Sequence, residues 1–248
     1  MTPSKKQLAR WADLKNRKDR DETGFFLAEG RKLVSEVKAA GWHIEALLVT
    51  EASLEAEGPD TYGLSDEQRA RVSGFRTAPE VLAVVRKPLS LDQPRWKPGT
   101  LALVLDGLQD PGNVGTLIRT AAWFGFEAVF HTPDTADPFG PKAVQASMGA
   151  LFRVKTGTVD EAWFDALPPQ TPVLGTFLEG DSVFGANLPA SGLLVMGNEG
   201  HGIGTLLETR INRRLTIPQF GLGTESLNVA AAAAIVMAEF RRMDLRGR

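Results

Sequence analysis

The stretch that decides the fold is residues 101–119, LALVLDGLQDPGNVGTLIR. It begins with five apolar residues in a row, which is typical of a strand covered on both faces of a parallel sheet. A turn-rich loop follows, and Asn113 then stands where a helix N-cap is expected, so a helix is predicted over 113–124. In that helix Gly115 and Arg119 lie one turn apart and share a face, which leaves room for a ligand against the backbone.

Two later segments also place glycine and a polar side chain at the end of an apolar run. They are residues 196–200, MGNEG, and residues 217–229, IPQFGLGTESLNV. Binding and catalytic residues gather on loops that a rigid scaffold positions, so three such segments predict one composite site. Each segment alone has a simpler interpretation: a capped helix with a surface arginine, a tight turn, or caps at Ser226 and Asn228 of a helix over 227–243.

The composition is that of an ordinary globular protein, with 248 residues, 43% of them hydrophobic and 23% charged. The chain has no cysteine, which excludes a disulfide framework, a thiolate zinc site and a cysteine nucleophile. No run approaches the roughly 18 to 20 apolar residues of a membrane span, so a cytoplasmic protein is the default expectation. The glycines at 107, 112 and 115 do not form the dinucleotide-binding fingerprint, which argues against a dehydrogenase.

The first 20 residues form a basic segment, with seven lysines and arginines against two aspartates. Such a segment can contact phosphates, and its binding would then depend on salt. It can equally be a solvated helix whose Leu8, Trp11 and Leu14 pack on the body of the protein. The two interpretations are compatible.

The remaining patterns predict two domains. Before residue 86 they predict a helix over 33–40, a strand over 44–49, and helices over 65–72 and 79–85. The proline-rich stretch 86–99 predicts a linker. After it, strands at 101–105, 128–130, 152–154, 173–176, 193–196 and 215–217 alternate with helices at 113–124, 141–147 and 160–166. We therefore expect an N-terminal domain over 1–92, a linker over 93–98, and a C-terminal domain over 99–248 with an open parallel sheet wrapped by helices.

The three segments together resemble the signature motifs of the SpoU-type (TrmH family) RNA 2′-O-ribose methyltransferases of the SPOUT superfamily. The first motif is Asn113-x-Gly115-x-x-x-Arg119, the second is Gly197-Asn198-Glu199-Gly200, and the third is Ile217-Pro218 followed by Ser226-Leu227-Asn228-Val229. The match covers residues 101–243, and Lys142–Ala150 resembles a further stretch between the first two motifs. Asn198 stands where many members have Ala or Pro, a difference expected to matter little at a surface turn.

The N-terminal part resembles the small ribosomal-protein-like RNA-binding module that precedes the catalytic domain in many members. Residues Phe26–Gly30 and the helix after them carry this likeness within residues 1–90. The fold implied for the whole chain is therefore a small α/β RNA-binding domain followed by a SPOUT-type open parallel sheet. The resemblance also implies a deep trefoil knot at the C-terminal end, which topology rules alone would not suggest.

The resemblance implies S-adenosylmethionine as cofactor and a homodimer with the site near its interface, without membrane or metal. The implied cofactor-binding residues are Gly197, Ile217 and Leu227, with Thr176, Phe177 and Met196 as further candidates. The reaction would be in-line methyl transfer to a ribose 2′-oxygen, which requires alignment and stabilisation of developing negative charge.

Five residues receive catalytic roles from the resemblance. Arg119 would hold a phosphate and stabilise charge on the 2′-oxygen, because a guanidinium keeps its proton in proteins. Asn113, Ser226 and Asn228 would orient the ribose and the loops, and Glu199 would fix either Arg119 or the turn of the second motif.

The substrate expected from the basic segment and the N-terminal module is large-subunit (23S-type) ribosomal RNA. The alternatives are a transfer-RNA 2′-O-methyltransferase, a base methyltransferase of the same superfamily, and an RNA-binding assembly factor with this fold but no catalysis.

Overall fold

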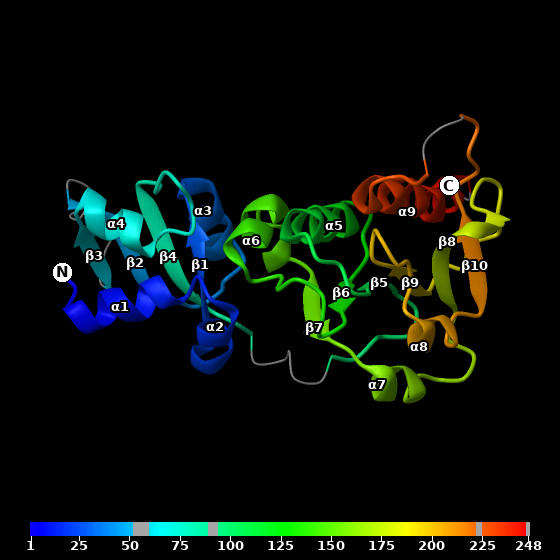
Figure 1. Cartoon of the computed structure of the whole chain (residues 1–248), viewed down its shortest axis with the longest axis horizontal. Helices are drawn as coiled ribbons and strands as arrows, with labels where there is room; N and C mark the ends of the chain where they lie inside the picture. Colours follow the sequence, from blue (N-terminus) through cyan, green and yellow to red (C-terminus); the bar gives the residue numbers. More distant parts are fainter. Residues whose placement is uncertain (52–59, 89–93, 222–224, 247–248) are drawn as a thin grey trace. The chain divides into compact units, whose positions relative to one another are not determined.

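The computed structural model describes residues 1–51, 60–88, 94–221 and 225–246, with side chains described as far as residue 242 (Figure 1). It divides into two compact units. The N-terminal unit comprises Met1–Leu89 together with Asp137–Arg153, and the C-terminal unit comprises Ser90–Ala136 and Val154–Arg248. The boundary expected at residues 92 and 93 falls outside the described residues. The segment 137–153, which the sequence analysis placed in the C-terminal domain, packs within the N-terminal unit.

The N-terminal unit is built on a four-stranded mixed sheet in the order β1-β4-β2-β3. β4 pairs antiparallel with β1 and with β2, whereas β2 and β3 are parallel. Its elements are α1 (Lys5–Asp13), α2 (Arg17–Thr23), β1 (Phe25–Glu29), α3 (Arg31–Ala39), β2 (Ile44–Thr50), β3 (Thr61–Leu64), α4 (Asp66–Val72), β4 (Val81–Arg86), α6 (Pro141–Ser147) and the 3₁₀ helix η3 (Ala150–Phe152).

The alternation of side chains along β1 shows how this sheet is covered on both faces. Phe25 and Leu27 face a core that α1 and α4 complete, and the predicted Leu8, Trp11 and Leu14 are buried there as expected. Phe26 faces an aromatic cluster with Trp42, Phe139 and Phe152, whose ring centroids lie 5.1 to 6.5 Å apart. The segment 137–153 therefore belongs to this unit because its two phenylalanines complete the second core.

The C-terminal unit is an open six-stranded parallel sheet in the order β10-β8-β9-β5-β6-β7, which confirms the predicted fold class. In Figure 1 α5 and α9 cover one face of this sheet, and α7 and α8 cover the other. Its elements are β5 (Leu101–Leu105), α5 (Pro111–Trp123), β6 (Ala128–His131), β7 (Lys155–Thr158), α7 (Glu161–Asp165), β8 (Val173–Ser182), β9 (Gly192–Met196), α8 (Thr205–Glu208), β10 (Arg213–Thr216) and α9 (Val229–Arg246). The knot implied by the resemblance stays a prediction.

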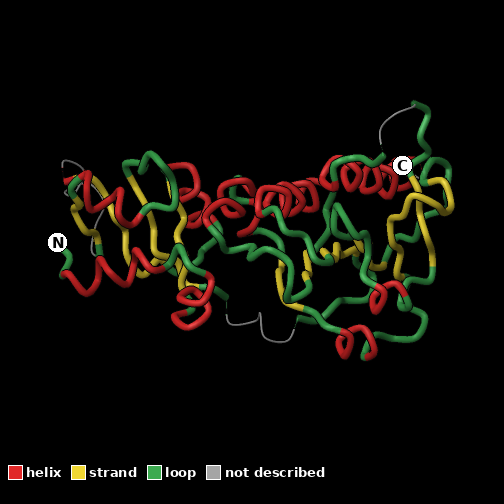
Figure 2. The backbone as a smooth tube through the Cα atoms, viewed as in Figure 1, coloured by secondary structure: helices red, strands yellow, loops and turns green. Residues whose placement is uncertain are grey.

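The predicted helix over 79–85 is wrong, because this segment forms β4 in the middle of its sheet (Figure 2). Val81–Val85 are all buried, and valine-rich runs fit a strand that is covered on both faces. The predicted strand over 152–154 is also misplaced, since Phe152 ends η3 and β7 begins at Lys155.

The helix caps differ from those predicted. α5 begins at Pro111, with Asp110 as its N-cap accepting a hydrogen bond from the Gly112 amide at 2.8 Å, so Asn113 is not the cap. α9 begins at Val229, and the Asn228 side chain accepts from the amides of Ala230 and Ala231, so Ser226 is not the cap either. In both helices the cap is the short polar residue directly before the first helical residue.

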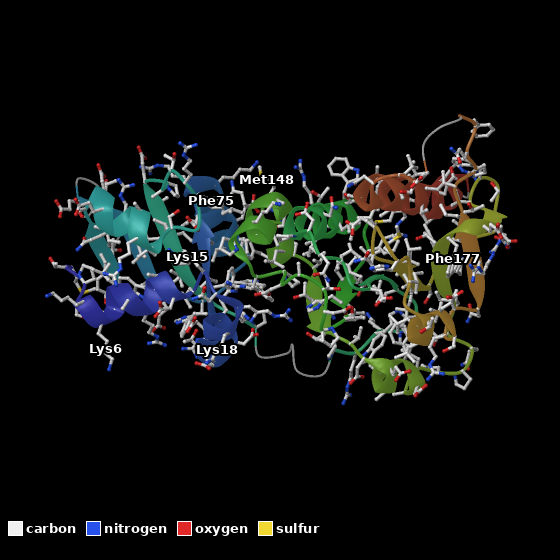
Figure 3. The ribbon with its side chains drawn as sticks, in the orientation of Figure 1. Lys6, Lys15, Lys18, Phe75, Met148 and Phe177 are labelled. Carbon is white, nitrogen blue, oxygen red and sulfur yellow. The ribbon has the colours of Figure 1, made fainter. Side chains whose placement is uncertain are left out.

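The basic N-terminal segment is folded into α1 and α2. Arg20 is buried, pairs with Asp137, and donates to two backbone carbonyls. Lys6 and Lys18 project outward and are exposed (Figure 3). Part of the predicted basic surface is therefore structural, and part remains open to a polyanion. Among the described residues, no helix has both the length and the apolar character needed to cross a membrane.

Candidate functional site

One side chain from each of the three segments meets in the C-terminal unit. Asn113 Nδ2 donates to Glu199 Oε1 at 2.7 Å, and Asn228 Nδ2 donates to Asn113 Oδ1 at 3.3 Å. Asn113 lies in the first turn of α5, where Asp110 already caps the helix, so both ends of its amide are available for these bonds. The structure therefore joins the three segments through one hydrogen-bonded chain.

Arg119 lies further along α5 and is exposed. Its guanidinium makes no hydrogen bond or ion pair with any residue that the structure describes. The carboxylate of Glu199 bonds to Asn113 rather than to Arg119. The guanidinium is thus an unpaired cation that a phosphate or a developing oxyanion can reach, with five N–H donors in a planar fork.

Glu199 is carried by a tight turn after β9. Asn198 and Gly202 exchange two backbone hydrogen bonds of 2.9 Å, and Asn198 Oδ1 accepts from the amides of Gly200 and His201. A Cβ at Gly197 would lie 2.3 Å from the carbonyl carbon of Gly202. Glycine is therefore required at 197 by the turn itself, and not only to let a ligand approach.

The candidate cofactor residues lie in, or directly after, three strands that are neighbours in the sheet. Met196 ends β9, Thr176 and Phe177 lie in β8, and Ile217 follows β10. Met196 is buried, and its sulfur lies 3.5 Å from the Thr176 hydroxyl. Phe177 (Figure 3) is half-buried, with the Arg214 guanidinium 3.6 Å from its ring centroid. These four residues thus lie on three adjacent strands, β10, β8 and β9, or directly after them.

The third segment contributes two exposed residues near the trio. Ser226 and Leu227 precede Asn228, and 51% of Leu227 is accessible to solvent. Ser226 makes no hydrogen bond with any residue in the described parts of the chain. Both side chains are therefore open to a ligand.

A register shift in β8 shapes this sheet edge. β10 pairs Arg214 with Gly175 and the next residue, Leu215, with Asp181, so Thr176–Gly180 are passed over by the pairing. Bulges leave backbone groups out of the ladder and are common next to functional sites. The candidate residues Thr176 and Phe177 lie in this bulge, outside the pairing with β10.

The sequence analysis missed Asp106, a buried carboxylate directly after β5. Its Oδ2 accepts from the Gly204 amide at 2.7 Å. Burial raises the pKa of Asp106, and the neighbouring charge of Asp134 raises it further, whereas hydrogen bonds from Gly204 and Thr132 act the other way. The signal available in the sequence was an aspartate that follows an unbroken apolar strand.

Comparisons with known proteins place these features in context. Residues 100–238 match the model of the SpoU rRNA Methylase family, and residues 5–85 match that of the MRM3-like substrate binding domain. A curated relative is the 23S rRNA (guanosine(2553)-2′-O)-methyltransferase RlmP of Bacillus subtilis (strain 168). It is 33% identical over 239 residues, which are 93% of this chain and 94% of that protein.

Two solved structures have the same fold over nearly the whole chain. A TrmH-family protein from Porphyromonas gingivalis matches with a TM-score of 0.86 and 39% identity, over 98% of this chain and 100% of that one. The SpoU methyltransferase AviRb from Streptomyces viridochromogenes, in complex with the cofactor AdoMet, matches with a TM-score of 0.84 and 28% identity, over 99% of this chain and 100% of that one.

Proposed function

The chain belongs to the SpoU rRNA methylase family, and from this membership we infer that it methylates a ribose 2′-hydroxyl of 23S-type ribosomal RNA, with S-adenosylmethionine as the methyl donor. The observation that carries the proposal within the structure is the hydrogen-bonded chain Glu199–Asn113–Asn228, which joins all three signature segments, with the unpaired Arg119 on the same helix as Asn113.

The residues at the sheet edge fit S-adenosylmethionine. The bulge of β8 leaves main-chain groups outside the ladder with β10, and Ile217, directly after β10, is a half-buried apolar residue. Leu227, next to Asn228, adds an exposed apolar side chain. Such a lining, apolar with a few convergent polar groups, is typical of cofactor sites. When bound, the cofactor supplies an electrophilic methyl group on a sulfonium. Gly197, Ile217 and Leu227 are the residues that we expect to hold it, with Thr176, Phe177 and Met196 beneath.

The chain's own residues supply alignment and charge stabilisation. The exposed Arg119 guanidinium holds a phosphate of the RNA and stabilises negative charge on the 2′-oxygen, where a fixed cation acts most strongly. Asn113 is held at both ends of its amide, so its orientation is fixed before the ribose arrives. Ser226, which has no described hydrogen bond of its own, adds a hydroxyl that can contact the ribose. A phosphate or a water takes the proton.

The N-terminal unit supports ribosomal RNA over transfer RNA as the substrate. It matches a substrate-binding domain, and Lys6 and Lys18 are exposed on its surface. Cations that neutralise phosphates make RNA binding depend on salt, without giving sequence specificity. The identity of the nucleotide must therefore come from other contacts. The cytoplasmic location stays an expectation of the sequence.

We also propose that the enzyme works as a homodimer. Trp123 on α5 is 84% exposed and Phe220, in the loop before α9, is 91% exposed. Large exposed apolar side chains of this kind often mark a protein interface. Because Trp123 lies on α5, the face of the sheet that α5 and α9 cover is the candidate for the second copy.

The deciding experiment is methyl transfer from labelled S-adenosylmethionine to 23S RNA taken from a strain that lacks the gene. We expect label in one 2′-O-methylated nucleoside after nuclease and phosphatase digestion of the RNA, and none in transfer RNA. Label in a modified base would instead identify a base methyltransferase. Binding of cofactor and RNA without any methyl transfer would favour an RNA-binding assembly factor. Label confined to transfer RNA would favour a transfer-RNA 2′-O-methyltransferase.

A further inference from the structure

Two hydrogen bonds connect the loop after β5 to the turn that carries Glu199. Asp106 Oδ2 accepts from the Gly204 amide at 2.7 Å, and Asn198 Nδ2 donates to the Gly107 carbonyl at 2.7 Å. The two bonds engage opposite ends of the turn, since residue 198 opens it and residue 204 closes it. We call this pair of side chains, Asp106 and Asn198, the clamp.

The loop side of the clamp is itself fixed. The Asp106 amide donates to the Met196 carbonyl at 2.9 Å, and the Gly107 amide donates to the Thr132 hydroxyl at 2.9 Å. That hydroxyl in turn donates to Asp134. The loop is therefore anchored to β9 and to the end of β6. Because the clamp bonds the turn to this loop, it fixes the position of the turn relative to both strands.

The turn does not need the clamp for its own shape. The paired backbone bonds between Asn198 and Gly202, together with the two amides that donate to Asn198 Oδ1, already close it. Asn198 Nδ2 thus contributes nothing to the turn and serves only the bond across to Gly107. What this bond fixes is the position of the whole turn, and of Glu199 with it, relative to the start of α5.

We propose that the clamp is a positioning device that holds Glu199 within hydrogen-bonding distance of Asn113, and so sets the rate of methyl transfer without setting cofactor affinity. The inference rests on the proposed function, because it assumes that Asn113 orients the ribose. Asn198, a residue expected to be neutral at a surface turn, becomes a positioning residue. The burial of Asp106 supports this, because a buried carboxylate is costly unless it is hydrogen-bonded, and the Gly204 amide supplies such a bond.

Asn198→Asp is the sharpest test, because it separates the two functions of this side chain. A carboxylate keeps the acceptor for Gly200 and His201, but it loses the donor to the Gly107 carbonyl and places an oxygen that repels this carbonyl in its position. We expect kcat to fall about fivefold to tenfold, the worth of one hydrogen bond. The dissociation constant for S-adenosylhomocysteine, measured by calorimetry without RNA, should stay within about twofold of the wild-type value. Asn198→Ala also loosens the turn, and both quantities should worsen.

Asp106 provides the second arm of the test. Asp106→Asn keeps an oxygen that can accept from the Gly204 amide, so it should retain most of kcat, whereas Asp106→Ala should lose about as much as Asn198→Asp. Asn187→Ala is the control, since Asn187 is exposed and its side chain makes no hydrogen bond among the described residues. Thermal unfolding of each variant shows whether the fold is intact, and Asn198→Asp remains informative if Asp106→Ala does not fold.

The proposed role of the clamp would be contradicted if Asn198→Asp kept the kcat of the wild-type enzyme. It would also be contradicted if this variant lost cofactor affinity by the same factor as kcat. Equal losses for Asp106→Asn and Asp106→Ala would show that the hydrogen bond to Gly204 is not what matters. A wild-type enzyme without methyl transfer would contradict the proposed function instead, so the two failures are distinguishable.

Discussion

Asn113 shows how the role of one side chain depends on its neighbours. Its position at the start of α5 predicted a helix cap, but Asp110 takes that role and bonds to the Gly112 amide. The amide of Asn113 is thereby free to bond with Glu199 and Asn228, which come from distant parts of the chain. A polar residue in the first turn of a helix can thus become part of a site, because another residue already accepts the hydrogen bond from the free amide at the helix N-terminus.

Arg119 gives the most direct prediction at this scale. Arg119→Ala should lower kcat by about 100- to 1,000-fold, the usual cost of removing a donor that stabilises developing charge. Cofactor affinity should be nearly unchanged, because the candidate cofactor residues lie in β8 and β9 and in the loops after β9 and β10, and not on α5. Arg95→Ala is the control for loss of an exposed arginine in the same unit. Single-turnover kinetics check the outcome, and retained turnover would remove Arg119 from the mechanism.

Glu29 predicts a pH-dependent stability. Burial raises the pKa of this carboxyl above 4.5, and hydrogen bonds from Ser73 and Gly74 and the charge of Lys15 oppose the rise. Because its pKa is higher in the folded state, Glu29 contributes fully to stability below its unfolded-state pKa, where it is protonated. This contribution is lost as the pH rises through its folded-state pKa. Glu29→Gln, which remains neutral, should therefore gain stability relative to wild type as the pH rises through this window.

Thermal unfolding midpoints at a series of pH values measure the difference. Glu67→Gln, on the exposed face of α4, is the control for removing a carboxylate. A difference between Glu29→Gln and wild type that shrinks with rising pH would contradict the assignment.

At the scale of elements, α5 and α9 pack side by side along one face of the parallel sheet. The alanine-rich start of α9 allows this, since Ala233 is fully buried and is followed by buried Val236 and Met237. Small residues let two helices approach closely. The same contact brings Asn228, just before α9, to Asn113 on α5.

The link between α2 and the segment 137–153 depends on one buried ion pair. Arg20 is 4% exposed, and its Nε and Nη2 each lie 2.7 Å from Asp137 Oδ2. Arg20→Ala leaves this carboxylate without its cation, so unfolding should become easier by about 3–5 kcal/mol. Urea unfolding followed by tryptophan fluorescence, to which Trp11 and Trp42 of the N-terminal unit contribute, measures the change.

The control for this prediction is Arg17→Ala on the same helix. Arg17 lies 3.7 Å from Asp21 on the exposed surface, where an ion pair contributes about 0–1 kcal/mol. Similar losses for the two variants would mean that burial of the Arg20 pair has no special consequence.

At the scale of the whole molecule, the proposed homodimer can be tested by mass. Sedimentation of the wild-type protein should give a species near twice the 26.8 kDa of one chain. Trp123→Glu, on the α5 side, should shift the protein toward the monomer because it places a charge in the proposed interface. Leu206→Glu is the matched control, since Leu206 is 61% exposed on α8, which covers the opposite face of the sheet. A wild-type protein that sediments as a monomer would contradict the proposal.

The sequence by itself determined the features that depend on local pattern. Unbroken apolar runs such as 101–105 and 193–196 predicted buried parallel strands, and the three glycine-bearing segments predicted a composite site. The likeness to a known family assigned their chemistry. The strand predictions are confirmed, because burial of a strand is encoded in neighbouring residues. The roles of the individual site residues stay predictions.

The tertiary structure decided what depends on residues distant in sequence. The valine-rich run 81–85 became a strand because β1 and β2 pair with it on both sides, and 137–153 joined the N-terminal unit because Phe139 and Phe152 complete an aromatic core there. Asn198 and Asp106 acquired their partners only when the loop after β5 met the turn after β9. A hydrogen bond needs its two atoms at contact distance and in the right orientation, and for residues so far apart in the chain only the fold supplies both.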